Sequence, residues 1–357
     1  MTNSPNVSEL MTPLLQSAVP TSVVDFWLGS INPLWSTQQA LARITKLESS
    51  ASDTVTLTLK ANRHVQGFLP GQHINITVEV NGVRRVRSYS PAWVNSSAGE
   101  FSISVKRVDG GAVSAWLSQP ACIGQVVEVS AAFGEMTLDA SQPKTTIMLA
   151  AGSGITPFLS LLRSQLADYP APITLLYWTK HEDELCFVDE FNALASTYPH
   201  FTVQYFLTQA NQPAQRLNEQ HLQSLINDAD NTQIFACGPQ GFVQHAAMLA
   251  KQQNITAVIE AFYAPEVIFD SNHQVAITLQ RSQKTIMVPV GQSILTALEA
   301  EGINPAYGCR RGLCNTCSCT KLSGSTQHLH NQDMNHESPT SLRICINSAS
   351  SDLTLDL

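Results

Sequence analysis

Residues 307–319 read Tyr-Gly-Cys-Arg-Arg-Gly-Leu-Cys-Asn-Thr-Cys-Ser-Cys, and the spacing of their cysteines decides the fold of the C-terminal region. Cys309, Cys314 and Cys317 follow the pattern C-x4-C-x2-C, and Cys345 comes 28 positions after the third. This is the plant-type spacing of four thiolates that hold a [2Fe-2S] cluster. A structural zinc site is the alternative, but zinc ligands normally come as C-x2-C pairs. The sequence therefore predicts these four cysteines as cluster ligands.

Other residues of the loop suit the same purpose. Gly308 and Gly312 let the backbone approach closely, so that N–H groups can point at the sulfurs. Arg310 and Arg311 add positive charge beside a negatively charged cluster. Cys319 is expected to point away from the ligands, by alternation along a strand, and to be a buried free thiol.

The sequence around this loop predicts a small α+β unit. Two strand-like runs, 275–281 and 286–290, form a hairpin signal, and a helix is expected over 293–301. Further towards the N-terminus, buried strand-like runs alternate with helix-like segments from residue 145 to 264, which indicates βαβ units and a parallel sheet. Short strand-like runs separated by turn residues from 40 to 139 favour an antiparallel barrel.

Composition excludes several classes of protein. The chain has 357 residues, of which 43% are hydrophobic and 13% charged, so it is neither disordered nor a coiled coil as a whole. Its net charge of -8 argues against nucleic-acid binding as the main activity. The sequence shows no apolar run of transmembrane length and no signal peptide. We therefore expect a cytoplasmic protein that is peripheral at the inner membrane, if at all, through a partner.

Two further motifs precede the cysteine loop. The run Arg87-Ser88-Tyr89-Ser90 ends a strand-like segment, and the Gly-rich turn 110–114 feeds a short helix predicted to begin at Ala115. A helix N-terminus after such a turn is a ready anion site. The run 149–157, with Gly152 and Gly154, also leads from a buried strand into a helix, and Cys237-Gly238-Pro239 ends a later strand. Each motif is weak alone.

These motifs, in this order, resemble the ferredoxin-NADP reductase family fused to a plant-type ferredoxin domain. The resemblance implies an FAD-binding antiparallel β-barrel, an NAD(P)-binding α/β domain and a β-grasp ferredoxin domain, with FMN as the alternative flavin. The Gly that usually follows the second ligand is Asn315 here, which is tolerable because Asn also adopts left-handed backbone conformations. The expected divisions are an N-terminal extension (1–37), the FAD domain (38–140), the NAD(P) domain (141–263), a linker (264–272) and the ferredoxin domain (273–357).

The resemblance also implies residue roles. Arg87 would pair with the FAD pyrophosphate, Tyr89 would pack on the isoalloxazine, and Ser90 would hydrogen-bond near N5. Cys237 would face the nicotinamide, while Phe262 would cover the flavin ring beside the acidic Glu260. The residues expected to act in catalysis are Ser90, Cys237 and Glu260. The residues expected to bind cofactors are His73, Arg87, Tyr89, Ser90, Lys106, Gly111, Ser114, Gly152, Gly154, Thr156, Lys180, Arg216, Gly238, Pro239 and Phe262.

The choice between NADPH and NADH depends on the residues at the end of the strand-like run 173–178. An acid there would accept from a ribose 2′-hydroxyl and repel a 2′-phosphate. Instead Thr179, Lys180 and His181 come next in the chain, and Arg216 lies past the following strand. The sequence therefore favours NADPH, with NADH as the alternative.

The function implied is electron transfer from NAD(P)H through FAD and the [2Fe-2S] cluster to a protein acceptor. FAD converts between a two-electron hydride and the single electrons that a cluster accepts. The aromatic-rich segment 24–36 is similar to the N-terminal extension of reductases paired with membrane-bound fatty-acid desaturases, which makes a desaturase the expected partner. A local apolar packing role is the alternative for this segment. The alternative functions are the reductase of an aromatic-ring or alkane oxygenase and a non-enzymatic redox-sensing or cluster-binding protein.

Overall fold

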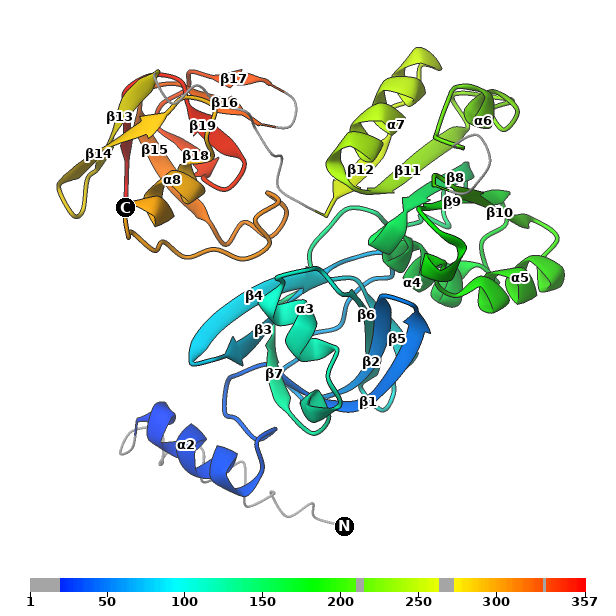
Figure 1. Cartoon of the computed structure of the whole chain (residues 1–357), viewed down its shortest axis with the longest axis horizontal. Coiled ribbons are helices and arrows are strands. Elements are labelled where there is room, and N and C mark those ends of the chain that lie inside the picture. Colours follow the sequence, from blue (N-terminus) through cyan, green and yellow to red (C-terminus); the bar gives the residue numbers. More distant parts are fainter. Residues whose placement is uncertain (1–19, 210–214, 263–272, 330–331) are drawn as a thin grey trace, which may run out of the picture.

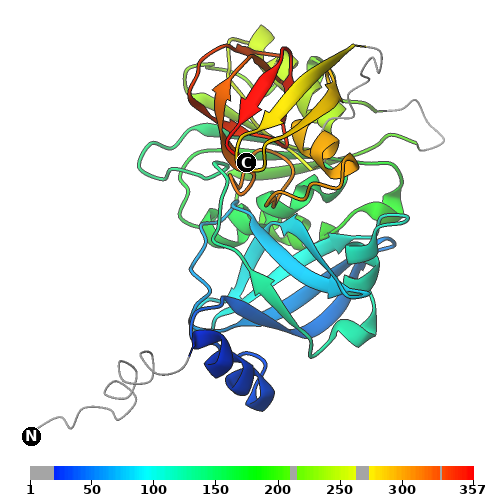
Figure 2. The same ribbon diagram turned by 90° about the vertical axis from the view of Figure 1, so that its left-hand side faces the viewer.

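The computed structural model describes residues 20–209, 215–262, 273–329 and 332–357. Within these residues the chain forms three units, each built on its own main sheet, and a helix, α2 (Thr21–Ile31), precedes them. Figure 1 shows the second and third units above the first, with α2 below it. In the view of Figure 2, α2 and the third unit again lie at opposite ends of the molecule. The linker predicted at 264–272 lies outside the described residues, and the domain limits stay predictions.

The first unit is the predicted antiparallel barrel, a seven-stranded sheet in the order β4-β3-β7-β1-β2-β6-β5. Its strands are β1 (Leu41–Ala51), β2 (Thr54–Ala61), β3 (Ile74–Val80), β4 (Val83–Tyr89), β5 (Pro91–Asn95), β6 (Glu100–Lys106) and β7 (Val126–Val129). Alternate residues turn inward, so that Leu57 and Leu59 of β2 are fully buried against Phe101 and Ile103 of β6. Helix α3 (Ala112–Leu117) caps this core with Val113 and Leu117.

The second unit is the predicted parallel sheet, with strand order β10-β9-β8-β11-β12. Its strands are β8 (Thr145–Ala151), β9 (Ile173–Thr179), β10 (Phe201–Leu207), β11 (Thr232–Gly238) and β12 (Val258–Ala261). Helices α4 (Ile155–Gln165) and α5 (Val188–Thr197) cover one face, and α6 (Gln220–Gln223) and α7 (Gln240–Gln252) cover the other. Because both faces are covered, the central strands carry continuous apolar runs. The carboxyl ends of β8 and β11, where ligands bind in such sheets, meet the barrel.

The third unit is the predicted α+β fold. Its mixed five-stranded sheet has the order β14-β13-β20-β15-β18, and a three-stranded sheet of β17, β16 and β19 lies beside it. The elements are β13 (Gln274–Leu279), β14 (Lys284–Pro289), α8 (Ile294–Ala300), β15 (Ser318–Ser323), β16 (Thr326–His328), β17 (Met334–Asn335), β18 (Thr340–Arg343), β19 (Asn347–Ala349) and β20 (Leu353–Leu355). The Ser293 side chain caps α8 by accepting from Thr296 N. The cysteine loop runs between α8 and β15.

Three local expectations need correction. Helix α3 begins at Ala112 and not at Ala115, because Gly111 already accepts the first helical hydrogen bond, from Ala115 N. Helix α4 begins at Ile155, inside the run 149–157 that was expected to precede it, directly after a tight turn at 152–154. The large apolar residues of segment 24–36 are not packed into a core, since α2 has no buried residue and Phe26, Trp27, Ile31 and Trp35 are exposed. None of the described helices is both long and apolar enough to cross a membrane.

Candidate functional site: two pockets and a cysteine loop

A pocket of about 350 Å³ lies where all three units meet. It is lined by the predicted flavin-binding residues of β4, β6 and α3 and by the start of the cysteine loop. The predicted residues that line it are Arg87, Tyr89, Ser90, Lys106, Gly111, Ser114, Thr156, Phe262 and Cys309. We call it the flavin pocket. The structure therefore brings together residues that lie more than 200 positions apart in the sequence.

The polar side chains that line the flavin pocket differ in how many of their hydrogen bonds are already made within the protein. Arg87 is exposed, and among the described residues its Nη1 donates to the carbonyl of its neighbour Val86 (2.7 Å), so the guanidinium is available to an anion. Ser114 is committed to the local turn, where its hydroxyl donates to Gly111 O (3.0 Å). Ser90 is buried and accepts from Thr156 Oγ1 of α4 (3.2 Å). The last contact ties the barrel to the second unit at the pocket floor.

A second pocket of about 740 Å³ lies at the carboxyl end of the parallel sheet. Five predicted cofactor-binding residues line this nucleotide pocket: Lys106, Gly152, Lys180, Arg216 and Pro239. Trp178, Phe242 and His245 also line it and were not singled out from the sequence. The His245 Nε2 atom lies 3.1 Å from Leu217 O.

Lys106 lines both pockets and is the residue they share. Its Nζ lies 2.8 Å from Asp53 Oδ2 in the barrel and 2.9 Å from Glu184 Oε2 in the second unit. Burial would lower the pKa of Lys106, but hydrogen bonds from Nζ to the two carboxylates raise it overall. The lysine stays charged, and much of its charge is already balanced before any phosphate binds. No sequence signal predicted these pairings.

The turn after β8 fits tightly against β11. A Cβ atom on Gly154 would lie 2.0 Å from Cys237 O, so only glycine fits at this position. Cys237 is fully buried, and its register partner in the neighbouring strand β12 is Glu260. Burial raises the pKa of the Cys237 thiol, and the nearby Glu260 carboxylate acts in the same direction. The predicted catalytic residues Cys237 and Glu260 are thus adjacent, while their catalytic roles stay predictions.

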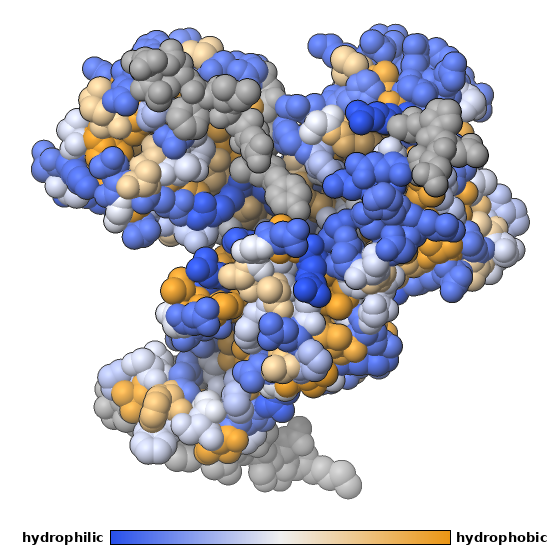
Figure 3. Space-filling view, viewed as in Figure 1, coloured by the Kyte–Doolittle hydropathy of each residue, from blue (hydrophilic) through white to orange (hydrophobic). Residues whose placement is uncertain are grey.

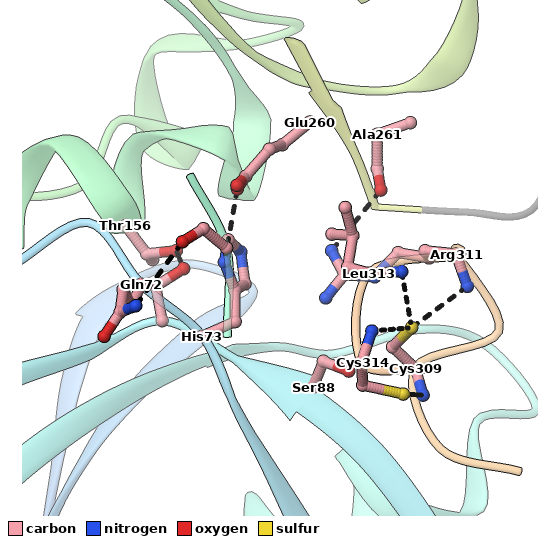
Figure 4. Close-up of polar contacts among 12 residues, drawn as sticks. Gln72, His73, Ser88, Thr156, Glu260, Ala261, Cys309, Arg311, Leu313 and Cys314 are labelled. Atoms are coloured by element: carbon pink, nitrogen blue, oxygen red, sulfur yellow. Dashed lines mark hydrogen bonds and ion pairs between the residues drawn. The ribbon is translucent and has the colours of Figure 1, made fainter. Parts of the chain in front are cut away.

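Glu260 faces His73 across the boundary between the second unit and the barrel (Figure 4). His73 Nδ1 lies 3.2 Å from Glu260 Oε2, and both side chains are almost fully buried. Among the described residues, neither the two ring nitrogens nor the two carboxyl oxygens form a hydrogen bond of normal geometry. Burial raises the pKa of Glu260 to about 7 and lowers that of His73 well below its usual range. His73 lines neither pocket, so a direct cofactor contact is unsupported.

The cysteine loop turns its backbone N–H groups towards sulfur, as predicted. Cys309 N donates to Cys314 Sγ (3.1 Å), and the N–H groups of Arg311, Leu313 and Cys314 all donate to Cys309 Sγ at 3.3 to 3.4 Å. A Cβ on Gly308 would come within 2.7 Å of Cys314 Sγ, which explains the glycine. Asn315 adopts the left-handed conformation, with φ of 56°.

The four predicted ligands form two thiol pairs. The side chains of Cys309 and Cys314 interact with each other, and so do those of Cys317 and Cys345. Two ligand pairs suit a cluster with two irons. Cys319 is a free thiol, half-buried rather than fully buried. The donor set therefore fits a [2Fe-2S] cluster.

Sequence-family models match the chain in three places. They are described as an oxidoreductase FAD-binding domain (residues 41–138), an oxidoreductase NAD-binding domain (148–248) and a 2Fe-2S iron-sulfur cluster binding domain (277–346). Among solved structures, phthalate dioxygenase reductase is 25% identical with a TM-score of 0.62, over 89% of this chain and 97% of that one.

Two relatives from Mycobacterium tuberculosis show the range of similarity. The ferredoxin reductase component of 3-ketosteroid-9-alpha-monooxygenase is 31% identical over 72% of this chain and 75% of its own length. A protein named NADPH oxidoreductase is 28% identical over 98% of this chain and 90% of its own length. The chain therefore belongs to the family of iron-sulfur flavoprotein reductases, oxidoreductases that use FAD, a pyridine nucleotide and a [2Fe-2S] cluster for electron transfer.

Proposed function

We propose that this protein is the NADPH-dependent reductase of a membrane-bound fatty-acid desaturase. Electrons would enter at the nucleotide pocket and leave by the cysteine loop, with FAD supplying the conversion from hydride to single electrons. The sequence similarity of segment 24–36 to the extension of desaturase reductases supports this acceptor. The observation that carries the proposal is the exposed apolar surface of α2.

Helix α2 presents large apolar side chains to solvent. Phe26, Trp27 and Ile31 are 67%, 64% and 72% exposed, and Trp35 just after the helix is also exposed. Figure 3 shows hydrophobic residues on this part of the surface, at the lower left. Several large apolar side chains exposed on one short helix favour an interaction site, and aromatic residues are favoured at a membrane interface. The packing alternative does not explain why these side chains face outward.

The polar groups around α2 hold the helix in place. The one charged residue of α2, Asp25, accepts hydrogen bonds from Thr37 N (2.6 Å) and Ser36 Oγ (3.1 Å). At the end of the helix, Asn32 Oδ1 accepts from Arg43 Nη2 of β1 (2.7 Å), and Asn62 Nδ2 donates to Leu34 O (3.1 Å). The apolar face is thus carried on a fixed support, which suits docking.

The position of α2 suggests an anchor and not an exit for electrons. The helix lies across the barrel from the third unit, which carries the cysteine loop (Figures 1 and 2). A membrane contact at α2 would leave the cluster side free to meet the acceptor. No Lys or Arg precedes Arg43, so the contact would depend on apolar burial and not on attraction to anionic lipid.

NADPH is proposed as the electron donor on two grounds. Lys180 and Arg216 are both exposed and both line the nucleotide pocket, where they can meet a 2′-phosphate. The relative that aligns with 98% of this chain is named NADPH oxidoreductase.

The test replaces Phe26, Trp27 and Ile31 together by Ser. NADPH-dependent reduction of ferricyanide and FAD content should stay as in the wild type, whereas flotation with phosphatidylcholine vesicles and the rate of desaturation by a membrane-bound desaturase should both fall. Adding anionic lipid should not rescue flotation. The control is Met287→Ser, which replaces another exposed apolar residue, on β14 of the third unit. Unchanged flotation and desaturation in the triple variant would refute the membrane role.

A second candidate is the reductase of an oxygenase. It is favoured by the 31% identical relative, which is named as the reductase component of a steroid monooxygenase. The test supplies a purified oxygenase with the wild-type reductase or with the triple variant. Equal oxygenase rates with both reductases, and no desaturase activity with either, would select this candidate.

A further inference from the structure

Arg311 is an arginine in a loop, yet it is only 7% exposed. It stands between the ligands Cys309 and Cys314, and its backbone N–H donates to Cys309 Sγ (3.3 Å). Arginine is seldom buried unless its charge is paired. The burial of Arg311 therefore requires an explanation in the residues around its guanidinium.

The side chain of Arg311 leaves its own unit and contacts the second one. Nη1 donates to Ala261 O at the end of β12 (3.3 Å), and the guanidinium carbon lies 5.4 Å from the centre of the Phe262 ring (Figure 4). One residue thus joins a cluster ligand, through its backbone, to the edge of the parallel sheet, through its side chain. The carbonyl and ring contacts partly offset the cost of burying the cation.

One donor of Arg311 is left unused. Nη2 is buried and has no hydrogen-bond partner among the described residues. Arg311 also lines the flavin pocket, together with Phe262. A buried charged donor without a partner is costly, and such groups are normally satisfied by a bound group. The unused donor therefore points to a ligand in this pocket.

The neighbouring Arg310 provides the contrast. Its guanidinium donates two hydrogen bonds to Glu299 of α8, one of them at 2.9 Å, and lies over the Tyr307 ring at 4.0 Å. Its charge is therefore balanced inside the third unit. Of the two adjacent arginines, Arg311 is the one that reaches another unit.

We propose that Arg311 is a positioning residue that fixes the cysteine loop against the flavin pocket and presents a buried positive charge to the bound FAD. A fixed cation at the pocket stabilises the reduced flavin, which carries more negative charge than the oxidised one, and so raises its midpoint potential. The contact with Ala261 sets the distance and orientation of the loop relative to the flavin. The proposal does not depend on the identity of the protein acceptor.

The experiment compares Arg311→Ala, Arg311→Lys and the wild-type holoenzyme. Redox titration with visible and electron paramagnetic resonance spectroscopy gives the potentials of flavin and cluster, and stopped-flow mixing with NADPH separates flavin reduction from cluster reduction. In Arg311→Ala the flavin potential should become more negative, and cluster reduction should slow by about tenfold or more. In Arg311→Lys the retained charge should restore most of the potential, whereas the shorter reach of the ammonium should leave cluster reduction slow.

A matched control and an independent readout complete the test. Arg281→Ala removes an exposed arginine of the same unit, paired with Asp356 away from the pocket, and should change neither quantity. Hydrogen exchange should rise in segments 258–262 and 307–313 of Arg311→Ala. A wild-type flavin potential together with wild-type cluster reduction in Arg311→Ala would overturn the proposal. If that variant loses FAD, wild-type cluster reduction in Arg311→Lys would overturn it.

Discussion

The flavin pocket and the nucleotide pocket are built on different principles. All three units contribute to the flavin pocket, and its wall continues into the cysteine loop at Gly308 and Cys309. The nucleotide pocket belongs to the second unit alone, except for Lys106 of β6. Under the predicted assignment, the electron donor, which must come and go, has a pocket on one unit, whereas FAD would bind next to the cysteine loop.

Lys106 helps to hold the two pockets in a fixed position relative to each other. Its ion pair with Glu184 crosses from the barrel to the second unit, whereas Asp53 pairs with it inside the barrel. The Thr156 to Ser90 hydrogen bond crosses the same boundary. The pockets can therefore be loaded separately while their separation stays fixed. Substitutions in each pocket, and in the loop beyond, should separate the three steps of electron transfer.

The largest effect is expected at the loop. Cys314→Ser removes a predicted cluster ligand but leaves the barrel and the second unit unchanged, so FAD should stay bound and ferricyanide reduction should survive. Reduction of cytochrome c or of the protein acceptor should fall by at least about 100-fold, because large acceptors are reached through the cluster. The absorbance spectrum should keep the flavin bands and lose the broad iron-sulfur shoulder. Full transfer to a protein acceptor in this variant would show that the loop is not the exit.

The next largest effect is expected in the flavin pocket itself. Arg87→Ala removes an exposed guanidinium whose hydrogen bond, within the part of the chain that the structure describes, goes to a neighbouring carbonyl, so FAD should be lost on gel filtration. The cluster spectrum should remain, since the ligands lie in the third unit. Arg84→Ala, which removes an exposed arginine of the same strand paired with Glu128, is the control and should keep FAD. Retention of FAD by Arg87→Ala would exclude the assigned pyrophosphate contact.

The cluster loop and the pocket motifs were predictable from sequence because they are local. The C-x4-C-x2-C spacing, the N–H groups turned to sulfur and the left-handed Asn315 all follow from a few adjacent residues. The reach of Arg311 to Ala261 and the pairing of His73 with Glu260 were not predictable, because each joins units far apart in the sequence. Neither was the exposure of α2, since an aromatic-rich segment ordinarily indicates burial.

A smaller effect is expected in the nucleotide pocket. Replacing Lys180 or Arg216 by Ala should raise the KM for NADPH by about 10- to 100-fold. This fold-change corresponds to the free energy of one charge-assisted hydrogen bond. The KM for NADH should hardly change, because NADH lacks the 2′-phosphate. Steady-state kinetics with both coenzymes measure this. Equal losses with the two coenzymes, or a wild-type preference for NADH, would contradict the assignment.

The smallest effect concerns the His73 and Glu260 pair, which joins the units that carry the two pockets. The folded-state pKa of Glu260 is raised from 4.5 to about 7, so the folded protein holds a proton that the unfolded chain releases. The stability that this proton contributes is fully present below about pH 4.5 and is lost as pH rises through 7. The folded-state pKa of His73 is lowered, so His73 acts in the opposite direction and costs stability below its unfolded value of 6.5.

The Glu260→Gln variant separates the two contributions. Relative to this variant, the wild type should lose about 2 kcal/mol of stability between pH 5.5 and pH 8. The loss occurs over the roughly 1.5 pH units between pH 5.5 and the raised pKa of about 7, where only the folded state keeps the Glu260 proton. The variant keeps His73, so the free energy of unfolding of the variant should rise as pH increases to about 6.5. Urea midpoints of the two proteins, measured across this range, give the difference. If the difference in stability between wild type and variant does not change with pH, the buried Glu260 is ionised throughout this range. Arg311, whose positive charge lowers the pKa of Glu260, would then balance the carboxylate.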